Sequence, residues 1–340
     1  MNAIPLNTFP ELEIFGSADD LGYQHGHQLA SQIEDTIEFY ARLFGRKQQD
    51  IFAMAKHFQR VIGGFKPEYT TEIEALAAAA QINPSWIYAL NARSEILNSL
   101  ALECTAVFFQ RTGLLGQNWD WSQKMENLVR LVKLKPKTGP IIRMLTEPGI
   151  IGKIGMNSEG LGVCLNILSC AKPTRGVPIH ILLRSILDSG DLREARTWIE
   201  RAGAGRASNI ILGFENGESL DIEFAGDEQF ELPRVAVQLH TNHYLGGQVA
   251  AGGLQLESSL TRYQRAEAMA VGLIEHDLEE MKGLLTDQSA AEASICSHYH
   301  AHELLGNCGT VCTLIMDLKS RQMHLKRGNN SDGSFTRYSL

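Results

Sequence analysis

The hydrophobic pattern of this chain changes its period near residue 100. Before that point, residues 18–46 carry apolar side chains at helical spacing, and similar patterns cover 48–63, 67–80 and 84–99. After it, short apolar runs such as TAVFFQ and LVRLVKLKP alternate with Gly, Asn, Pro and Lys, which is typical of strands joined by hairpins. A mostly helical segment followed by a sheet-rich segment is the expected organisation.

The remaining patterns indicate the fold class. A short strand is expected near LEIFGS, further helices at about 178–188, 191–202 and 257–287, and a last strand pair in GTVCTLIMDLKSRQMHLKRG. Strands in runs and helices in runs favour an α+β fold, with antiparallel sheets covered by helices, over a parallel βαβ fold. The tail GNNSDGSFTRYSL is polar, and we expect it to be loosely held.

Composition excludes several classes of partner. The net charge of −8 offers no electrostatic reason to bind nucleic acid or an anionic membrane surface. We find no apolar run as long as a spanning helix, and the first residues lack a basic region followed by an apolar core. We therefore expect a soluble, cytoplasmic protein of 340 residues that binds neither nucleic acid nor membrane.

The six cysteines form no close C-x-x-C pair and are too sparse for a disulfide scaffold, so reduced, buried thiols are expected. His298, His300 and His302 alternate in SHYHAHE, a spacing that can place metal ligands on one face of a strand. No carboxylate completes this set, because Glu303 would point the other way. We therefore predict no metal and no cofactor.

One cysteine stands at the start of a predicted hairpin, in LECTAVFFQRTGLLGQNWDW. A turn centred on Thr112, or on 112–113, places Cys104 opposite residue 120 or 121 and brings Asp120 beside it. A carboxylate next to a thiol alone would raise the pKa of the thiol, whereas a carboxylate next to a free α-ammonium would orient a usable base. That second arrangement requires a cut between Glu103 and Cys104; without a cut, Cys104 is a buried structural residue.

Several segments occur together in an order that resembles one family: GSADDLGYQHGHQLA, ALNARSE, CTAVFF, GQNWDW and LHTNHYL. They are similar to the acyl-coenzyme A:6-aminopenicillanic acid (isopenicillin N) acyltransferase family, over residues of about 11 to 320. That family belongs to the N-terminal nucleophile hydrolases. The resemblance implies a four-layer α/β/β/α sandwich of two antiparallel sheets with a mostly helical N-terminal segment.

The resemblance also implies self-cleavage before Cys104. Residues 1–103 would be a helical pro-segment retained as a small subunit, residues 104–340 the catalytic subunit, and the two fragments a heterodimer, with further oligomerisation left open. The thiol would attack the preceding carbonyl, and the freed α-amine would then serve as its base. The penicillin-pathway members have Gly before the nucleophile, where this chain has the less permissive Glu103, so we expect cleavage to be slow.

The remaining site residues follow from the same resemblance. Cys104, Asp120 and Asn242 are the expected catalytic residues, with the Asn242 side-chain amide donating to the oxyanion. Alternation along the strand predicts that Asn118 shares a face with Asp120 and that Trp119 packs in the sheet interface. Supporting or substrate-contacting roles are expected for a further set: Thr105, Asn118, Asn166, Thr310 and Arg262. On periodicity alone, Arg262 would lie on a solvated helix face.

These residues predict an amidohydrolase that cleaves a linear amide of a small N-acyl or peptide-like substrate through a thioester on Cys104. The alternative is an acyltransferase that moves an acyl group from an acyl-CoA or an amide to an amine, because both reactions use the same machinery. A third reading, from another class, is a non-catalytic binding protein that is never processed. The expected partner is a small-molecule amide or acyl-thioester substrate.

Overall fold

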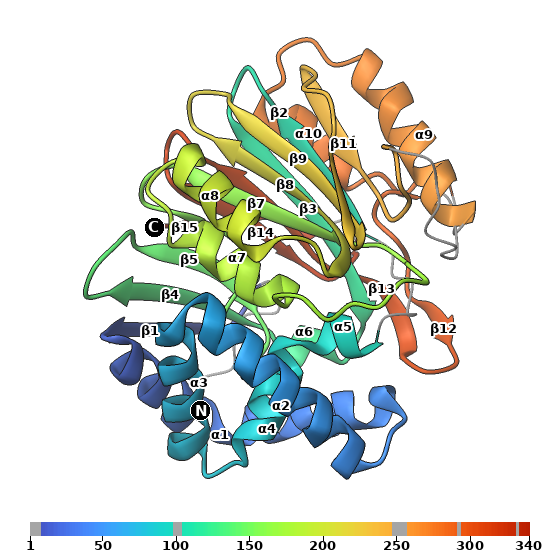
Figure 1. The fold of residues 1–340 in the computed structure, drawn as a ribbon. Coiled ribbons are helices and arrows are strands. Elements are labelled where there is room, and N and C mark those ends of the chain that lie inside the picture. Colours follow the sequence, from blue (N-terminus) through green and yellow to red (C-terminus); the bar gives the residue numbers. More distant parts are fainter. Residues whose placement is uncertain (1–7, 98–103, 247–256, 291–293, 331–332) are drawn as a thin grey trace.

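The computed structural model describes residues 8–97, 104–246, 257–290, 294–330 and 333–340. These residues form two sheets stacked face to face, with helices on both outer faces and a helical group at one end of the stack (Figure 1). The predicted fold class, an α/β/β/α sandwich with a helical N-terminal segment, is confirmed. No helix within the described ranges is both long and apolar enough to cross a membrane.

Helices cluster at the N-terminal end of the chain, as predicted. They are α1 (Ala18–Phe44), α2 (Gln48–Phe65), α3 (Pro67–Ala80), α4 (Pro84–Asn91) and α5 (Arg93–Leu97). Ser17 and Asp20 form a capping box at the start of α1, and the Asn83 side chain accepts a hydrogen bond from the Ser85 backbone N–H at the start of α4. The predicted start of α4 at Pro84 is therefore confirmed.

Later helices cover the sheets. They are α6 (Met125–Leu128), α7 (Ile179–Leu187), α8 (Leu192–Ala202), α9 (Glu257–Val271) and α10 (Leu278–Leu285). Helices α7 and α8 lie over one sheet, and α9 and α10 lie over the other (Figure 1). Helix α10 packs on its sheet through Met281, Leu284 and Leu285, which join a core cluster with Val107 and Phe109.

Sheet A has the strand order β1-β4-β5-β6-β7-β8-β9-β10. Its strands are β1 (Glu11–Gly16), β4 (Arg130–Pro136), β5 (Ile142–Thr146), β6 (Ile154–Asn157), β7 (Leu161–Ile167), β8 (Arg206–Phe214), β9 (Ser219–Gly226) and β10 (Glu228–Glu231). All described pairs are antiparallel except β1 with β4, which is parallel. The all-antiparallel prediction is wrong at this pair, because the chain between β1 and β4 runs through helices α1–α5 and the β2–β3 hairpin of the other sheet, a connection long enough for parallel pairing.

Sheet B has the strand order β11-β2-β3-β13-β14-β15, with β12 added on β13. Its strands are β2 (Cys104–Phe109), β3 (Leu114–Ser122), β11 (Val237–His240), β12 (His300–His302), β13 (Gly306–Asp317), β14 (Gln322–Arg327) and β15 (Thr336–Ser339). Strands β2 and β3 are buried along their whole lengths, because sheet A covers one face and helices cover the other. This double burial explains their continuous apolar runs.

The structure corrects other details of the sequence prediction. The pattern over 84–99 divides into α4 and α5 at Ala92, which leaves the helical conformation, and residues 98–99 lie outside the described residues. The pattern over 257–287 divides into α9 and α10, with His276 at positive φ just before α10. The polar tail forms β15 on β14, where the Tyr338 side chain is buried.

The N-terminal segment is part of the same body as the sheets. Strand β1 pairs with β4, and α1 packs closely on α3. A Cβ at Gly22 or Gly26 of α1 would lie 2.1 Å from the Glu72 carbonyl oxygen or 2.2 Å from that of Leu76, so only glycine permits this approach. The described residues 8–97 therefore share one hydrophobic core with the described residues of the sheets.

The two sheets are joined by a polar contact as well as by apolar packing. The Gln117 side chain of β3 donates to the Leu165 carbonyl of β7, and its Oε1 accepts from the Leu165 N–H at 2.9 Å. A buried amide with both of its ends paired to one residue fixes the relative position of the strands. This contact aligns β3, which carries Asp120, with β7, which ends beside Asn242.

Candidate active site

Strand β2 begins at Cys104, whose side chain is 3% exposed. Its direct partner on β3 is Trp119, so the predicted pairing with residue 120 or 121 is wrong by one or two positions. The turn contains the four residues 110–113 and is closed by a 2.9 Å hydrogen bond from the Gly113 N–H to the Phe109 carbonyl. Gly113 has a φ of 74°, which suits glycine and centres the turn earlier than the sequence indicated.

The register places the thiol and the carboxylate on opposite faces of sheet B. Direct cross-strand partners share a face, so Cys104 and Trp119 both face sheet A. Lys153, which precedes β6 of sheet A, holds its Nζ 3.1 Å from the centroid of the Trp119 ring. Asp120 projects to the other face, where the Thr310 hydroxyl donates to its Oδ1 at 2.6 Å. The structure therefore places Thr310, one of the predicted site residues, in contact with Asp120.

Burial raises the pKa of the Cys104 thiol to about 12, and the negative charge of Asp120 adds to this effect. The Asp120 backbone N–H and the positive charges of Arg262 and Lys153 act in the opposite direction without cancelling it. In the uncleaved chain, residue 104 therefore carries a protonated thiol. A separate base must remove its proton before the sulfur can attack a carbonyl.

The backbone of Cys104 is held from the helical side by two buried residues. Its N–H donates to Asn242 Oδ1 at 2.6 Å, and its carbonyl accepts from Arg262 Nη1 at 2.8 Å. Arg262 Nη2 also donates to Asn242 Oδ1 at 3.1 Å, and Nη1 donates to the Thr105 hydroxyl at 3.0 Å. Arg262 is fully buried and not on a solvated face, so one guanidinium connects Cys104, Thr105 and Asn242.

Asn242 has a well-defined amide orientation in this network. Its Oδ1 accepts from two donors, while its Nδ2 donates to the Ile167 carbonyl at 2.9 Å. The predicted oxyanion role uses that same Nδ2 as a donor. In the uncleaved chain the oxygen of the amide therefore binds the backbone of Cys104, and its nitrogen binds the Ile167 carbonyl.

Other residues predicted for the site lie around this network in different roles. Asn118 shares the outer face with Asp120, as predicted, and donates to the carbonyls of Leu285 and Ile295 at 2.7 and 2.8 Å. It therefore ties the helical layer to β3. Asn166 lies near the other side of the site and donates to the His240 carbonyl at 3.4 Å. Glu103 lies outside the described residues.

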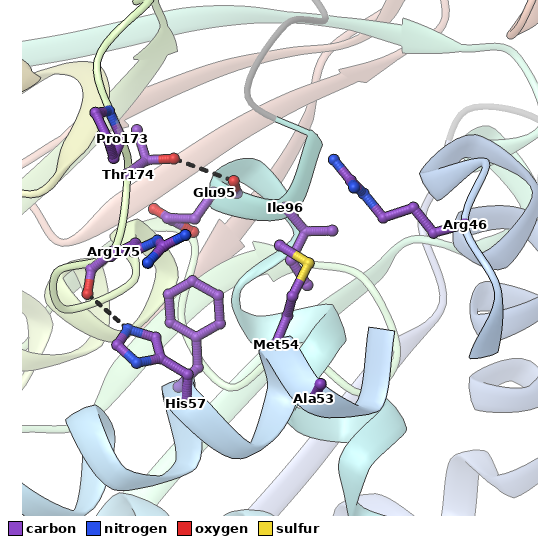
Figure 2. Close-up of a pocket in the computed structure, with 10 residues that line it drawn as sticks. Arg46, Ala53, Met54, His57, Glu95, Ile96, Pro173, Thr174 and Arg175 are labelled. Atoms are coloured by element: carbon purple, nitrogen blue, oxygen red, sulfur yellow. Dashed lines mark hydrogen bonds between the residues drawn. The ribbon is translucent and has the colours of Figure 1, made fainter. Parts of the chain in front are cut away.

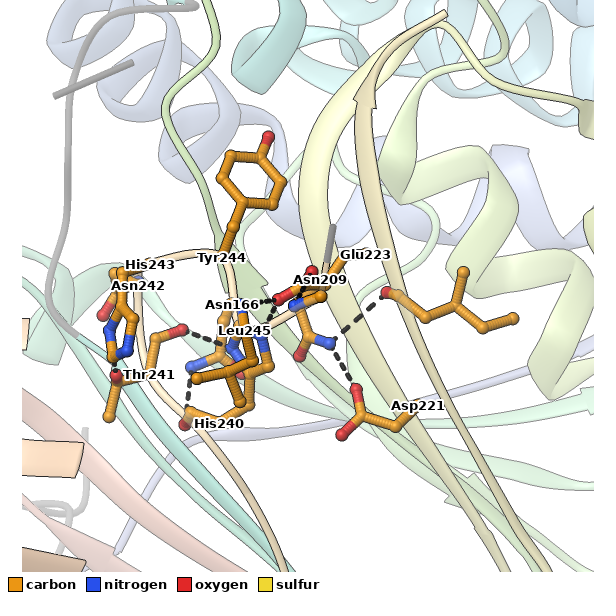
Figure 3. Close-up of polar contacts among 12 residues, drawn as sticks. Asn166, Asn209, Asp221, Glu223, His240, Thr241, Asn242, His243, Tyr244 and Leu245 are labelled. Atoms are coloured by element: carbon orange, nitrogen blue, oxygen red, sulfur yellow. Dashed lines mark hydrogen bonds and ion pairs between the residues drawn. The ribbon is translucent and has the colours of Figure 1, made fainter. Parts of the chain in front are cut away.

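The loop that carries Asn242 is fixed by Glu223 of β9 (Figure 3). The Glu223 carboxylate accepts from His240 Nε2 at 2.8 Å and from the backbone N–H groups of Leu245 and Gly246 at 2.6 and 2.9 Å. Burial would lower the pKa of His240, but its hydrogen bond to Glu223 and the nearby carboxylates outweigh burial and raise it. Sequence reasoning missed Glu223; the signal was an acidic residue inside the apolar run SLDIEFAG.

The opposite end of this loop rests on α9. The Asn242 N–H donates to Ser259 Oγ at 2.8 Å, and Ser259 Oγ lies 2.9 Å from His243 Nδ1. Burial lowers the pKa of His243 to about 4, so the ring is neutral near neutral pH. Ser259 and Arg262 lie one helical turn apart, and α9 thus positions both the loop and Cys104.

A second polar cluster lies beneath Trp119 and was also missed from the sequence. Glu147 pairs with Lys153 Nζ at 2.7 Å and with Arg93 Nε at 3.0 Å, and it accepts from the Tyr40 hydroxyl at 3.0 Å. Burial would raise the pKa of Glu147, but the two cations hold it at about 2. In the sequence, the signal was the acidic Glu147 and the basic Lys153 on either side of the short apolar run in TEPGIIGK.

A cavity of about 500 Å³ opens between α2, α5 and the loop before α7 (Figure 2). Its polar lining comprises Arg46, His57, Glu95, Thr174 and Arg175. Glu95 Oε1 accepts from the Ile179 N–H at 2.8 Å, and Oε2 has no hydrogen-bond partner among the described residues. Burial raises the pKa of Glu95 to about 7. The cavity therefore offers two guanidinium groups and a carboxyl group that is partly protonated near neutral pH.

Metal ligation finds no support in the described ranges. They contain no group of three or more His, Cys, Asp and Glu residues that could hold a metal ion. The alternating histidines fall on β12 and just before it, where the His302 ring nitrogen accepts from the Leu304 and Leu305 N–H groups at 3.2 and 3.3 Å. That contact orients His302 toward its own turn.

Comparisons with known proteins agree with the segments that suggested a resemblance. The family model for acyl-coenzyme A:6-aminopenicillanic acid acyl-transferase matches residues 109–332. The 40 kDa form of acyl-coenzyme A:6-aminopenicillanic-acid-acyltransferase from Emericella nidulans is 31% identical over 341 residues, which cover 94% of this chain and 93% of the relative. The family match includes Asp120, Asn242 and Arg262.

Similar solved structures include a mutant conjugated bile acid hydrolase from Clostridium perfringens, with 11% identity and a TM-score of 0.49 over 70% of this chain and 92% of that chain. Penicillin V acylase from Agrobacterium tumefaciens has 13% identity and a TM-score of 0.43 over 70% of this chain and 86% of that chain.

Proposed function

Because this chain belongs to the acyl-coenzyme A:6-aminopenicillanic acid acyltransferase family, we propose that it cleaves its own Glu103–Cys104 bond and then hydrolyses a small N-acyl or peptide-like amide through a thioester on Cys104. Family membership confirms the resemblance inferred from the sequence and the expectation of an enzyme. The cleavage, the cysteine nucleophile and the substrate class are the proposal.

The observation that carries this proposal is the pair of hydrogen bonds that holds the backbone of Cys104. At this first residue of a buried strand, the N–H donates to Asn242 Oδ1 and the carbonyl accepts from Arg262 Nη1, and both side chains are buried. Any buried backbone group needs a hydrogen-bond partner, but here Arg262 also bonds Asn242, so the position of Cys104 is fixed relative to Asn242. A nucleophile that must meet a carbonyl at a defined angle requires such a fixed position.

Self-cleavage would proceed by an N-to-S acyl shift. The sulfur of Cys104 attacks the carbonyl carbon of residue 103, the C–N bond breaks, and the nitrogen gains a proton to become an α-amine. Water then hydrolyses the thioester, which leaves a carboxylate on residue 103 and regenerates the thiol. The segment before Cys104 remains attached through noncovalent contacts, since β1 belongs to sheet A and Arg93 and Tyr40 bind Glu147.

In the mature enzyme, the new α-amine would serve as the base for the same thiol. A free α-amine has a pKa of about 7.7–8.0, so a substantial fraction is unprotonated near neutral pH. Asn242 Oδ1 already accepts from this nitrogen and would orient it. For Asn242 Nδ2 to stabilise the oxyanion of a substrate, it must exchange the Ile167 carbonyl for the reacting oxygen.

The cavity between α2 and α5 supports the choice of a small polar amide. Its volume of about 500 Å³ falls within the usual range for small-molecule sites. Arg46 and Arg175 in its lining suit a carboxylate or a carbonyl-rich group, and α5 is the last described helix before Cys104. We propose that this cavity receives part of the substrate.

The alternative activity is acyl transfer to an amine. It is favoured by the fungal relative, which covers 94% of this chain and is named an acyltransferase. Water and an amine compete for the same thioester, so the two activities differ only in which acceptor is bound. A panel of N-acyl amides and acyl thioesters, followed by mass spectrometry with and without added amine, separates them.

The test of self-cleavage is the intact mass of the purified chain over time, together with N-terminal sequencing. The expected products are two fragments, one of which begins at Cys104. Cys104→Ala should abolish both cleavage and turnover, and Cys104→Ser should slow cleavage because a hydroxyl is the poorer nucleophile. Cys170→Ala, at another buried cysteine outside this network, is the matched control and should cleave normally. A chain that stays intact and inert would instead be a binding protein.

A further inference from the structure

Lys153 is a buried basic side chain that has no role in the cleavage steps proposed above. Its side chain is 2% exposed, and its Nζ lies 2.7 Å from Glu147 Oε1 and 3.1 Å from the centroid of the Trp119 ring. Lysine is seldom buried to this degree unless it is paired. Here the pairing is incomplete, because Glu147 is shared with Arg93. The cluster of one carboxylate and two cations holds an excess positive charge when Lys153 is protonated.

This cluster lies on the side of sheet B to which the Cys104 thiol points. Trp119 is the direct cross-strand partner of Cys104, and such partners have Cβ atoms about 4.5–5.5 Å apart. The Lys153 ammonium therefore lies over the Trp119 indole, and the Cys104 side chain lies beside Trp119 on the same face of the sheet. Their charges act on each other: that of Lys153 lowers the pKa of the thiol, and that of the thiolate raises the pKa of Lys153.

The first step of cleavage lacks the base that the mature enzyme would use. Before the cut, the nitrogen of residue 104 is an amide, and it donates to Asn242 in the uncleaved chain. Asp120 and its partner Thr310 lie on the other face of the sheet. The chain therefore needs a proton acceptor on the face of the thiol. Among the groups of the Glu147 cluster there, the two cations hold the pKa of Glu147 at about 2, so Lys153 is the better proton acceptor.

We propose that Lys153 is the general base of self-cleavage, whose neutral amine takes the Cys104 thiol proton as the sulfur attacks the carbonyl carbon of residue 103. This inference rests on the proposed function. The resulting ammonium then returns that proton to the nitrogen of Cys104 as the C–N bond breaks. The products are a thioester at residue 103, a free α-amine and a neutral Lys153, so atoms and charges balance before water hydrolyses the thioester.

The groups around Lys153 favour the neutral amine near neutral pH. Burial lowers its pKa to about 7; the charge of Glu147 opposes this shift and that of Arg93 adds to it. The charge of Lys153 also acts on His180 and Cys312, which are both buried. Burial is the main cause that lowers the pKa of His180 and raises the pKa of Cys312, so both side chains are neutral. A base with a pKa close to the working pH combines availability with proton affinity.

The test follows self-cleavage of the full-length chain made in a cell-free reaction and then moved into buffers between about pH 5.5 and 9. In the wild-type chain we expect the cleavage rate to rise through about pH 7, where Lys153 loses its proton. Lys153→Met should slow cleavage by about 100-fold or more and remove this rise, since general bases contribute about 10²- to 10⁴-fold. Lys153→Arg keeps the charge but cannot accept a proton, and should be equally slow.

Lys326→Met is the matched control, because Lys326 is a buried lysine on β14 whose removal leaves the Glu147 cluster intact. It should cleave at close to the wild-type rate. Melting curves identify a variant that has not folded, in which case Lys153→Arg and the wild-type pH profile decide. The inference is overturned if either folded Lys153 variant cleaves within about threefold of wild type, or if the wild-type rate is flat across neutral pH. A wild-type chain that never cleaves overturns both the proposed function and this inference. A wild-type chain that cleaves while the Lys153 variants cleave equally fast overturns this inference alone.

Discussion

Replacing Arg262 by Met tests whether the buried guanidinium positions Cys104 for the proposed self-cleavage. The side chain of Arg262 bonds the Cys104 carbonyl, the Thr105 hydroxyl and Asn242 Oδ1 at 2.8, 3.0 and 3.1 Å. Methionine is of similar length and fills most of the same space without donating a hydrogen bond. The substitution therefore removes the positioning contacts while it preserves much of the packing.

The magnitude follows from the type of contact that is lost. A hydrogen bond from a charged donor contributes about 1.5–3 kcal/mol, and contacts made by one group are not additive. A loss of about 2–4 kcal/mol of positioning energy corresponds to a cleavage rate about 30- to 1000-fold slower. The three acceptors are neutral, so removing Arg262 also removes the cost of burying a charge, and the free energy of unfolding should change by less than about 2 kcal/mol.

The assay compares Arg262→Met with Arg265→Met on the same helix. Arg265 is partly exposed and pairs with Asp287, away from Cys104. For each variant, intact mass over time gives the cleavage rate, and thermal melting gives the stability. We expect Arg262→Met to be slow but stable, and Arg265→Met to cleave like the wild-type chain.

The reasoning is refuted if Arg262→Met cleaves within about threefold of Arg265→Met while both remain folded. It is equally refuted if the rate falls only in proportion to a loss of folded protein, because the guanidinium would then act on stability and not on position.

The other predictions concern the carboxylate, the loop and the fragments. Thr310→Val removes the hydroxyl that donates to Asp120 and should slow turnover by about 10-fold or more, as measured by amide hydrolysis; an unchanged rate would show that Asp120 needs no such partner. The pKa of His240 is raised by Glu223, so this pair stabilises the fold fully below pH about 6.5 and loses that effect as pH rises through the raised value. Glu223→Gln should remove this decrease from the plot of melting temperature against pH. A plot parallel to that of the wild-type chain would contradict the assignment. After cleavage, the fragment that carries β1 should co-elute with the larger fragment in size-exclusion chromatography without denaturant and separate only with it, because β1 is a strand of sheet A.

Much of the fold could be read from local patterns. Helices α2 and α3 were predicted within a few residues, because apolar spacing and caps are properties of neighbouring residues. The hairpin of β2 and β3 was also predicted, but its register was wrong by one or two positions. The register depends on the turn geometry that Gly113 allows, and the order of residues alone was compatible with more than one centre of the turn.

The site divides in the same way. Cys104, Asp120 and Asn242 were named from segments of sequence, and the family they suggested is confirmed. Their roles stay predictions, and the structure adds a condition to one of them: in the uncleaved chain, the Asn242 amide donates to Ile167 and binds Cys104 through its oxygen. This arrangement joins residues more than a hundred positions apart, which no local pattern encodes.

The sequence by itself determined the family, the order of helices and strands, and the cysteine at the start of β2. Only the tertiary structure decided that Arg262 is buried against Cys104, and that Lys153 lies over the indole of Trp119, the cross-strand partner of Cys104. The physical reason is that a charged residue in a sequence is expected to be solvated, since burying a charge is costly. Burial next to a reactive group becomes visible only when strands and helices distant in the chain enclose it.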